Sequence, residues 1–322
     1  MPKHLNWRPI LVGIALVATA CGSEATKDAT PTTRTSAGIA ATVASYELVA
    51  GKPQRFIVGL LRDDQRKVVS FGTVKLAFAF LGDRPQATQD ANVRFTKEAQ
   101  FIPIPGQHLD PAAPGPRIVD GSDGTGVYRA TDVTFDEAGF WGVQVEARIG
   151  GQIRAAQASF QVLPAHQIPS PGDRAPLTNN PVAGAAGVDP RAIDSRAGKG
   201  TPIPDPTLHA TSIADALAAH RPLMVVISTP TYCMSRFCGP LTDSVEQLAK
   251  QYGDKMAFVH LEVWQDFDTK ALNPAAAEWI QRQDGDANEP WTFVVGSDGI
   301  IKQRFDNVAT DQELQDAVAA LT

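Results

Sequence analysis

The sequence predicts a two-domain protein, with an all-β domain followed by an α/β domain. At 322 residues, the chain exceeds the roughly 100 to 200 residues of one ordinary domain. Residues 43–163 alternate apolar and polar side chains with a period of two, which is typical of half-buried strands. Residues 205–322 instead alternate short apolar runs with stretches of helical periodicity, the pattern of a βαβ arrangement.

The first 20 residues have the pattern of a secretory signal peptide. Lys3, His4 and Arg8 form a basic start, and an apolar run of 12 residues follows over 9–20. This run is shorter than the ~20 residues that a membrane-spanning helix needs. We therefore expect a cleaved leader over 1–20 instead of a membrane span.

The leader ends in Ala18-Thr19-Ala20-Cys21, which resembles the bacterial lipobox, where small residues precede a lipidated cysteine. The resemblance implies a mature chain that begins at Cys21 and is lipid-anchored on the extracytoplasmic face of the cell membrane. Leucine is usual where this chain has Ala18, and the alternative is a chance cysteine after the leader. Residues 21–42 lack apolar periodicity and are rich in small polar residues, so we expect a flexible tether there.

Charge and composition exclude some classes of protein. Hydrophobic residues make up 43% and charged residues 20% of the chain, which argues against disorder throughout and against multiple membrane spans. The net charge is −6, and removal of the leader takes the 29 basic residues to 27 against 35 acidic ones. Nucleic acid is not expected as a partner, because phosphates bind to basic surfaces.

Residues 43–163 are expected to form an antiparallel β-sandwich of immunoglobulin-like type with six or seven strands. The runs 74–80 and 141–147 alternate apolar with polar or small residues, and Gly150-Gly151 predicts a hairpin turn. Closure as a barrel is the alternative. A Pro- and Gly-rich stretch over 101–126 predicts a long loop, which is either a binding loop or a disordered insertion.

The segment that follows the β domain has the composition of a linker. Residues 164–206 contain nine of the 24 prolines and show little apolar periodicity. We therefore expect an extended Pro-rich linker over 164–204, with the two domains separable there.

The C-terminal domain predicts alternating helices and strands. The expected elements are helix 212–220, strand 223–228, helix 240–253, strand 256–264, helix 273–283, strands 292–296 and 300–305, and a last helix from 310. Strand 223–228 is continuously apolar, which favours a strand covered on both faces. The connection from this strand to the next should be a right-handed parallel crossover.

Residues 205–322 resemble the thioredoxin superfamily in two local motifs and in their order of elements. An apolar strand runs into Cys233-Met234-Ser235-Arg236-Phe237-Cys238, at the strand-to-helix junction where the superfamily keeps its redox pair. Glu289-Pro290-Trp291 precedes a strand and resembles the segment with the superfamily's cis-proline, which Pro290 would be. The resemblance implies a thioredoxin-like fold, a redox-active disulfide between Cys233 and Cys238, and Pro290 opposite the pair.

The spacing of this pair departs from the familiar Cys-x-x-Cys. Residues five apart on a continuous helix point roughly 140° apart, so Cys233 must precede the helix while Cys238 lies at its first turn. A Cα separation near the ~5.5 Å of disulfides is then feasible. By superfamily position, Cys233 would attack and Cys238 would resolve, although Cys238 lies closer to the thiolate-stabilising helix N-terminus. A purely structural disulfide is the alternative.

Glu262 and His260 are candidate proton shuttles. They share one face of strand 256–264, and Glu262 lies toward its C-terminal end, where sites gather in α/β sheets. The alternative interpretation is a satisfied buried histidine and a carboxylate at the rim. The strand before Cys233 carries no acid.

Disulfide exchange with protein thiols and disulfides, without a cofactor, is the leading functional hypothesis. The second is Cu(I) binding by Cys233, Cys238 and His260, because thiolates and imidazole suit that ion. A peroxidase related to peroxiredoxins is a third, since residues 171–176 resemble the Gly-x-x-Ala-Pro segment of those proteins. A non-catalytic binding lipoprotein with a structural disulfide is the fourth, because a fold alone does not define a function.

Overall fold

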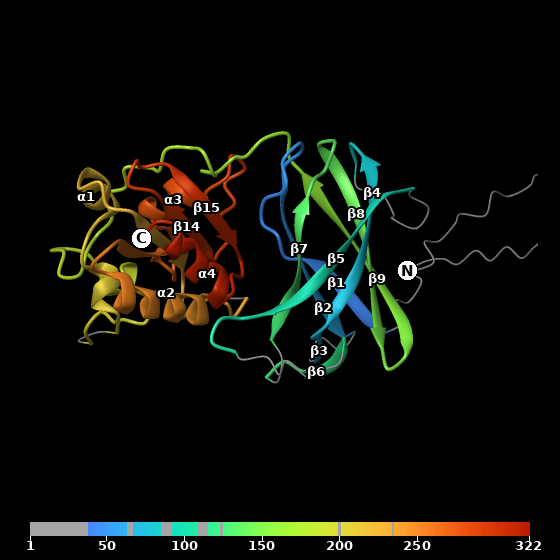
Figure 1. The fold of residues 1–322 in the computed structure, drawn as a ribbon. Helices are drawn as coiled ribbons and strands as arrows, with labels where there is room; N and C mark the ends of the chain where they lie inside the picture. Colours follow the sequence, from blue (N-terminus) through green and yellow to red (C-terminus); the bar gives the residue numbers. More distant parts are fainter. Residues whose placement is uncertain are drawn as a thin grey trace, which may run out of the picture. The chain divides into compact units, whose positions relative to one another are not determined.

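The computed structural model describes residues 38–62, 67–84, 92–107, 115–122, 125–198, 201–233 and 235–322. It contains a large antiparallel β-sheet region, followed by a mixed α/β sheet with helices (Figure 1). The expected leader, the expected lipidation site Cys21 and most of the expected tether lie outside the described residues. Within the described residues, no helix is both long and apolar enough to cross a membrane.

Among the described residues, nine strands form the sheet of the N-terminal region, more than the six or seven expected. They are β1 (Ile39–Val43), β2 (Gln54–Arg62), β3 (Lys67–Ser70), β4 (Thr73–Gly82), β5 (Val93–Pro103), β6 (Arg117–Asp120), β7 (Gly126–Val133), β8 (Gly139–Ile149) and β9 (Gln152–Val162). All pairs are antiparallel, in the order β6-β3-β2-β7-β5-β4-β8-β9, with β1 on β2. Strand β6 occupies part of the stretch expected to be a long loop.

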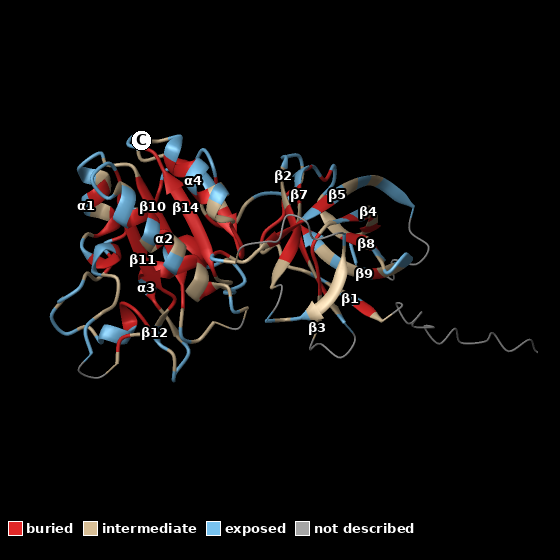
Figure 2. Cartoon of the chain, turned by 60° about the horizontal axis from the view of Figure 1, so that its bottom comes forward, coloured by how far each residue is buried: buried red, intermediate tan, exposed pale blue. Residues whose placement is uncertain are grey.

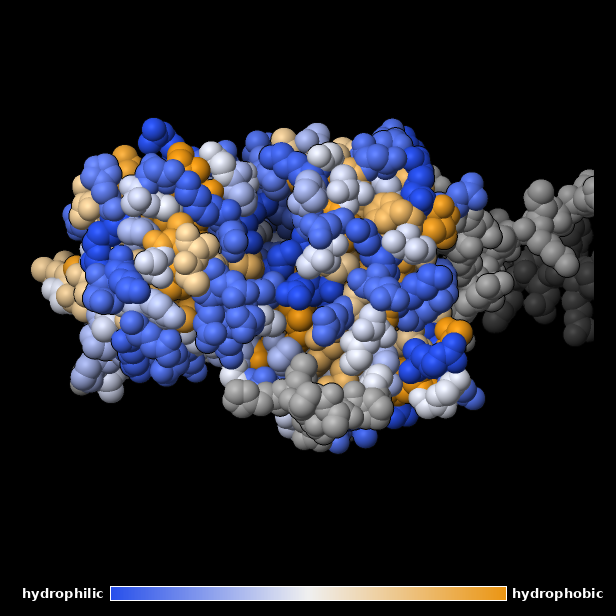
Figure 3. Space-filling model, viewed as in Figure 1, coloured by the Kyte–Doolittle hydropathy of each residue, from blue (hydrophilic) through white to orange (hydrophobic). Residues whose placement is uncertain are grey.

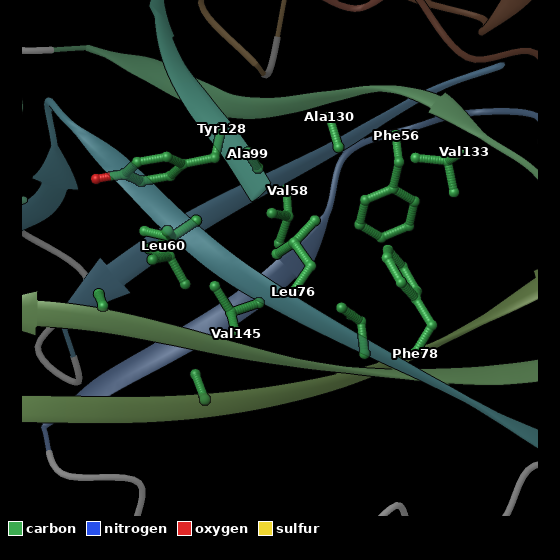
Figure 4. Close-up of a cluster of buried hydrophobic side chains, with 14 of the residues drawn as sticks. Phe56, Val58, Leu60, Leu76, Phe78, Ala99, Tyr128, Ala130, Val133 and Val145 are labelled. Carbon is green, nitrogen blue, oxygen red and sulfur yellow. The ribbon is translucent and has the colours of Figure 1, made fainter. Parts of the chain in front are cut away.

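The sheet curls so that one face encloses an apolar core. Strands β7 and β5 separate β2 from β4 in the sheet, yet the rings of Phe56 on β2 and Phe78 on β4 meet edge to face at 4.9 Å (Figure 4). Phe135 and Trp141 are both fully buried and belong to the same cluster. The predicted alternation on β4 is confirmed from Val74 to Phe78, where Val74, Leu76 and Phe78 are buried. It fails at the next two positions, where Ala79 is buried and Phe80 only partly so, because the pairing with β5 shifts register after Phe78.

The second region is built on a four-stranded mixed sheet. Its elements are η1 (Pro190–Ala192), η2 (Pro206–His209), α1 (Ile213–Ala218), β10 (Leu223–Ser228), α2 (Cys238–Tyr252), β11 (Ala257–Glu262), β12 (Trp264–Asp266), β13 (Ala271–Leu272), α3 (Pro274–Ile280), β14 (Trp291–Val295), β15 (Ile301–Asp306) and α4 (Asp311–Ala319). The strand order is β11-β10-β14-β15, with β10 and β11 parallel and the other pairs antiparallel. The short strands β12 and β13 pair with each other.

Strand β10 is buried along its whole length, as its apolar sequence predicts (Figure 2). Leu223, Val225 and Ile227 pack in one cluster with α1 and α3, whereas Met224 and Val226 pack in another with α2 and α4. The alternation of side chains along a strand thus gives each face of the sheet its own pair of helices. The carboxyl end of β10 leads into residues 229–237, the cysteine loop, which connects this strand to α2.

The segment after β9 packs on this second region, which its linker-like composition does not reveal. Ile168 and Ala175 are buried in the cluster that contains α1 and α3. The Trp279 indole N–H donates to Thr178 Oγ1 at 2.9 Å, and the Ile213 N–H donates to Asn180 Oδ1 at 2.8 Å. Isolated apolar residues and buried polar ones share these contacts, so the segment shows no hydropathy period.

Candidate functional site

Cys233 and Cys238 form a disulfide at the junction between β10 and α2. Their Cα atoms lie 5.9 Å apart, and α2 begins at Cys238. The expectation that Cys233 precedes the helix while Cys238 lies in its first turn is confirmed. Pro240 is the third residue of α2 instead of the first.

The two sulfurs have different surroundings. Cys238 is fully buried, whereas Cys233 is partly exposed. The Cys238 backbone N–H donates to Cys233 Sγ at 3.3 Å, and Ser235 Oγ lies 3.3 Å from the same sulfur. A backbone N–H at the N-terminus of α2 thus faces Cys233 Sγ, and donors at such a position are the kind that stabilise a thiolate.

Tyr46, which lies between β1 and β2, is close to the cysteine loop and to the segment around Pro290. The Tyr46 hydroxyl donates to the Glu289 carbonyl, directly before Pro290, and its ring lies 5.8 Å from that of Trp291. The Glu289–Pro290 peptide bond is cis, and Pro290 is buried. Burial and the nearby Glu289 and Asp306 raise the pKa of Tyr46, whereas the Ser235 side chain acts in the opposite direction. Tyr46 is therefore a neutral hydrogen-bond donor beside the cysteine loop.

The N-terminal region also covers the residue before Cys238. Phe237 packs against a small buried cluster that contains Ile57, Ile102 and Val127 from the β region, together with Val308. Burial also raises the pKa of the carboxyl group of Glu289, the residue directly before Pro290, to about 7. Sequence reasoning missed Tyr46 and Phe237 because their partners lie far away along the chain.

Glu262 and His260 lie on β11, both fully buried. Glu262 accepts hydrogen bonds from the N–H groups of Ser195 at 2.8 Å and Trp264 at 3.3 Å, yet burial raises its pKa to about 7. Ser195 Oγ in turn accepts from the N–H of Thr231, in the cysteine loop. Glu262 is thus linked to the loop through Ser195, while a direct contact with either sulfur is not among its described hydrogen bonds.

His260 faces a different set of groups from the one expected. Its Nε2 lies 3.1 Å from the Ser228 carbonyl oxygen, and burial lowers its pKa to about 4. Within the described residues, the cluster of potential metal ligands is His260 with Asp194 and His209, and it does not contain the two cysteines. Asp194 and His209 were missed by sequence reasoning, since both lie in or next to the expected linker.

A cavity of about 850 Å³ lies beside the cysteine loop. Tyr232, next to Cys233, forms part of its wall and stacks on Phe267 with the ring centroids 3.8 Å apart. Trp264 and Leu177 also line the cavity, and Leu177 is 76% exposed.

On the face of the molecule seen in Figure 3, hydrophilic side chains predominate and apolar ones are scattered.

Comparison of the chain with protein-family models, with curated proteins and with solved structures finds no match.

Proposed function

We propose that this protein is an extracytoplasmic thiol-disulfide oxidoreductase, anchored to the membrane by lipid, whose second region is thioredoxin-like. One observation carries the proposal: Cys233 is partly exposed and accepts a helix N-terminal N–H, while its partner Cys238 is fully buried. An accessible attacking sulfur and a protected resolving sulfur are what disulfide exchange requires. The strand order β11-β10-β14-β15 supports the thioredoxin-like assignment.

The finer assignment of the β region, an immunoglobulin-like sandwich, belongs to the same proposal. Its support is the single core between β2 and β4, which are not neighbours in the sheet. Tyr46 and Phe237 support a functional role for this region. Tyr46 connects it to Glu289, and Phe237 connects it to the cysteine loop. The β region would hold the exchange site in place and restrict how substrates approach it.

The exchange balances as two sulfur displacements. The Cys233 thiolate attacks one sulfur of a substrate disulfide, forms a mixed disulfide and releases the other substrate sulfur as a thiolate. The Cys238 thiolate then attacks Cys233 Sγ, which releases the second substrate thiolate and forms the Cys233–Cys238 disulfide. The substrate is reduced and the pair is oxidised, and the reverse sequence oxidises a substrate dithiol.

Trapping tests this assignment in cells that express the full chain. Cys238→Ser should accumulate mixed disulfides with other secreted proteins, because the release step is lost, and the matched control Cys233→Ser should accumulate none. Non-reducing electrophoresis followed by mass spectrometry of the adducts measures this. Absence of adducts from both variants, with a loss of about 2–5 kcal/mol in unfolding free energy, would make the disulfide structural.

Fractionation of the same cells tests whether the protein is attached to the membrane. The leader and Cys21 motivate the lipid anchor, so the adducts of Cys238→Ser should fractionate with membranes. Adding Cys21→Ala should move them to the soluble fraction or block processing of the leader. Membrane association that survives this change would rule out lipidation as the anchor.

A further inference from the structure

A cluster of three buried ionisable side chains lies between the segment after β9, η2 and β11. Asp194 comes from that segment, His209 ends η2 and His260 lies in the middle of β11. Their exposed fractions are 0%, 1% and 2%. The disulfide exchange proposed above does not use this cluster.

The separations within the cluster are too long for good hydrogen bonds. Asp194 Oδ2 lies 3.4 Å from His209 Nε2 and 3.6 Å from His260 Nδ1. N–H···O hydrogen bonds normally span about 2.7–3.2 Å. Both ring nitrogens of His209 and Nδ1 of His260 are buried without a hydrogen-bond partner. Buried polar atoms of this kind are rare in native proteins and call for an explanation.

The hydrogen bond of His260 fixes which of its nitrogens has a free lone pair. Its Nε2 faces the Ser228 carbonyl oxygen, which can only accept, so Nε2 carries the proton. In the neutral imidazole, Nδ1 then presents its lone pair to the Asp194 carboxylate. Two lone pairs that face each other repel unless a cation lies between them. Imidazole ligands of metals are oriented in this way, by a carbonyl that accepts from the other ring nitrogen.

We propose that Asp194, His209 and His260 bind a divalent transition-metal ion of the Zn(II) type. Zn(II) bonds to imidazole and carboxylate are about 2.0–2.2 Å long, which places adjacent ligand atoms in a tetrahedron about 3.3–3.6 Å apart. The separations of 3.4 and 3.6 Å fit this spacing, and all three ligand atoms lie within 4.8 Å of one another. The ion would tie the segment after β9 and η2 to the central sheet.

The charges around the cluster favour a cation. Arg196 donates through Nε to Asp194 Oδ1 at 3.0 Å and through Nη2 to Oδ2 at 2.7 Å, which holds the carboxylate toward the two histidines. The same guanidinium also pairs with Asp205 and lies 3.5 Å from Asp243. One positive and three negative groups leave a net negative charge, so Arg196 orients Asp194 without cancelling the attraction for a metal ion.

Titration of the untagged, oxidised full chain with Zn(II) and with Co(II), after treatment with a chelator, tests this proposal. One equivalent of either ion should bind, and Co(II) should give the visible absorption of tetrahedral coordination. Asp194→Asn, which preserves the shape of the side chain, and His209→Gln, which removes the imidazole ligand, should each weaken binding at least tenfold. The matched control His220→Gln changes an exposed histidine and should bind like the parent chain.

A double variant, Cys233→Ser with Cys238→Ser, separates this site from the disulfide. This variant should bind the metal ion as the parent chain does. That result would support the metal site even if the proposed disulfide exchange were disproved. The proposal is overturned if the parent chain binds neither ion, if His209→Gln and Asp194→Asn both bind normally while folded by circular dichroism, or if loss of the cysteines abolishes binding.

Discussion

Trp279→Ala is expected to lower the free energy of unfolding by about 3–5 kcal/mol, because it empties a large buried site. Trp279 on α3 has no exposed surface, and its ring lies 5.0 Å from that of Phe293 on β14. Its indole N–H also donates a hydrogen bond to Thr178 Oγ1, in the segment that was expected to be a linker. The substitution therefore removes packing on the sheet and one attachment of that segment at once. Urea denaturation of the full chain, followed by circular dichroism, measures the loss.

Trp279→Phe is the matched control for this prediction. Phenylalanine keeps an aromatic ring but cannot donate to Thr178, so we expect a loss of only about 1–2 kcal/mol. A loss below about 1 kcal/mol for Trp279→Ala itself would mean that the site is not packed as described. Equal losses for both variants would assign the effect to the hydrogen bond instead of the ring.

Glu47→Gln is expected to lower the free energy of unfolding at pH 7 by about 3 kcal/mol. The Glu47 side chain is 1% exposed and is paired with Arg304 of β15, while the Gln167 N–H donates to it at 2.7 Å. Burial acts to raise its pKa, but the hydrogen bond with His166, the charge of Arg304 and the Gln167 N–H outweigh burial and lower the pKa to about 2. Glutamine keeps the shape but leaves Arg304 without its counter-charge.

The pH dependence gives this prediction a definite sign. The folded pKa of Glu47 is depressed below the ordinary 4.5, so its contribution is fully present above pH 4.5. It is lost as the pH falls from about 4.5 to about 2, so the difference between parent and Glu47→Gln should shrink over that range. Glu137→Gln is the control, because Glu137 pairs with Arg94 at the surface and should matter by less than about 1 kcal/mol. A constant difference from pH 7 to pH 2 would contradict the account.

The sequence predicted the elements whose apolar residues follow a regular period. Strand β10, helix α2 and the position of the cysteines at their junction follow from a continuous apolar run and from the spacing of Leu241, Val245 and Leu248, which are all buried. Strands β3 and β6 have only four residues each, too few to establish a period. Strand β1 is composed largely of Ala and Thr, so composition placed most of it in the tether.

The surroundings of the site could not be predicted, because they are made by polar residues distant in the chain. Tyr46 meets the Glu289 carbonyl across 243 positions, and Ser195 meets Glu262 across 67. Asp194 and Thr178 are buried, yet they lie in a Pro-rich stretch with little periodicity. Hydropathy registers burial of apolar residues only, so a segment held by hydrogen bonds and ion pairs has the composition of a linker.

The reduction potential of the Cys233–Cys238 pair tests the central claim most directly. The full chain with Cys21→Ser, which removes the third cysteine, is equilibrated with dithiol and disulfide buffers of known ratio, and the free thiols are counted by alkylation and mass spectrometry. A pair that exchanges with protein substrates should have a potential above about −300 mV. A potential clearly below that value would contradict the account, because the disulfide would then resist reduction and act as a structural link between β10 and α2.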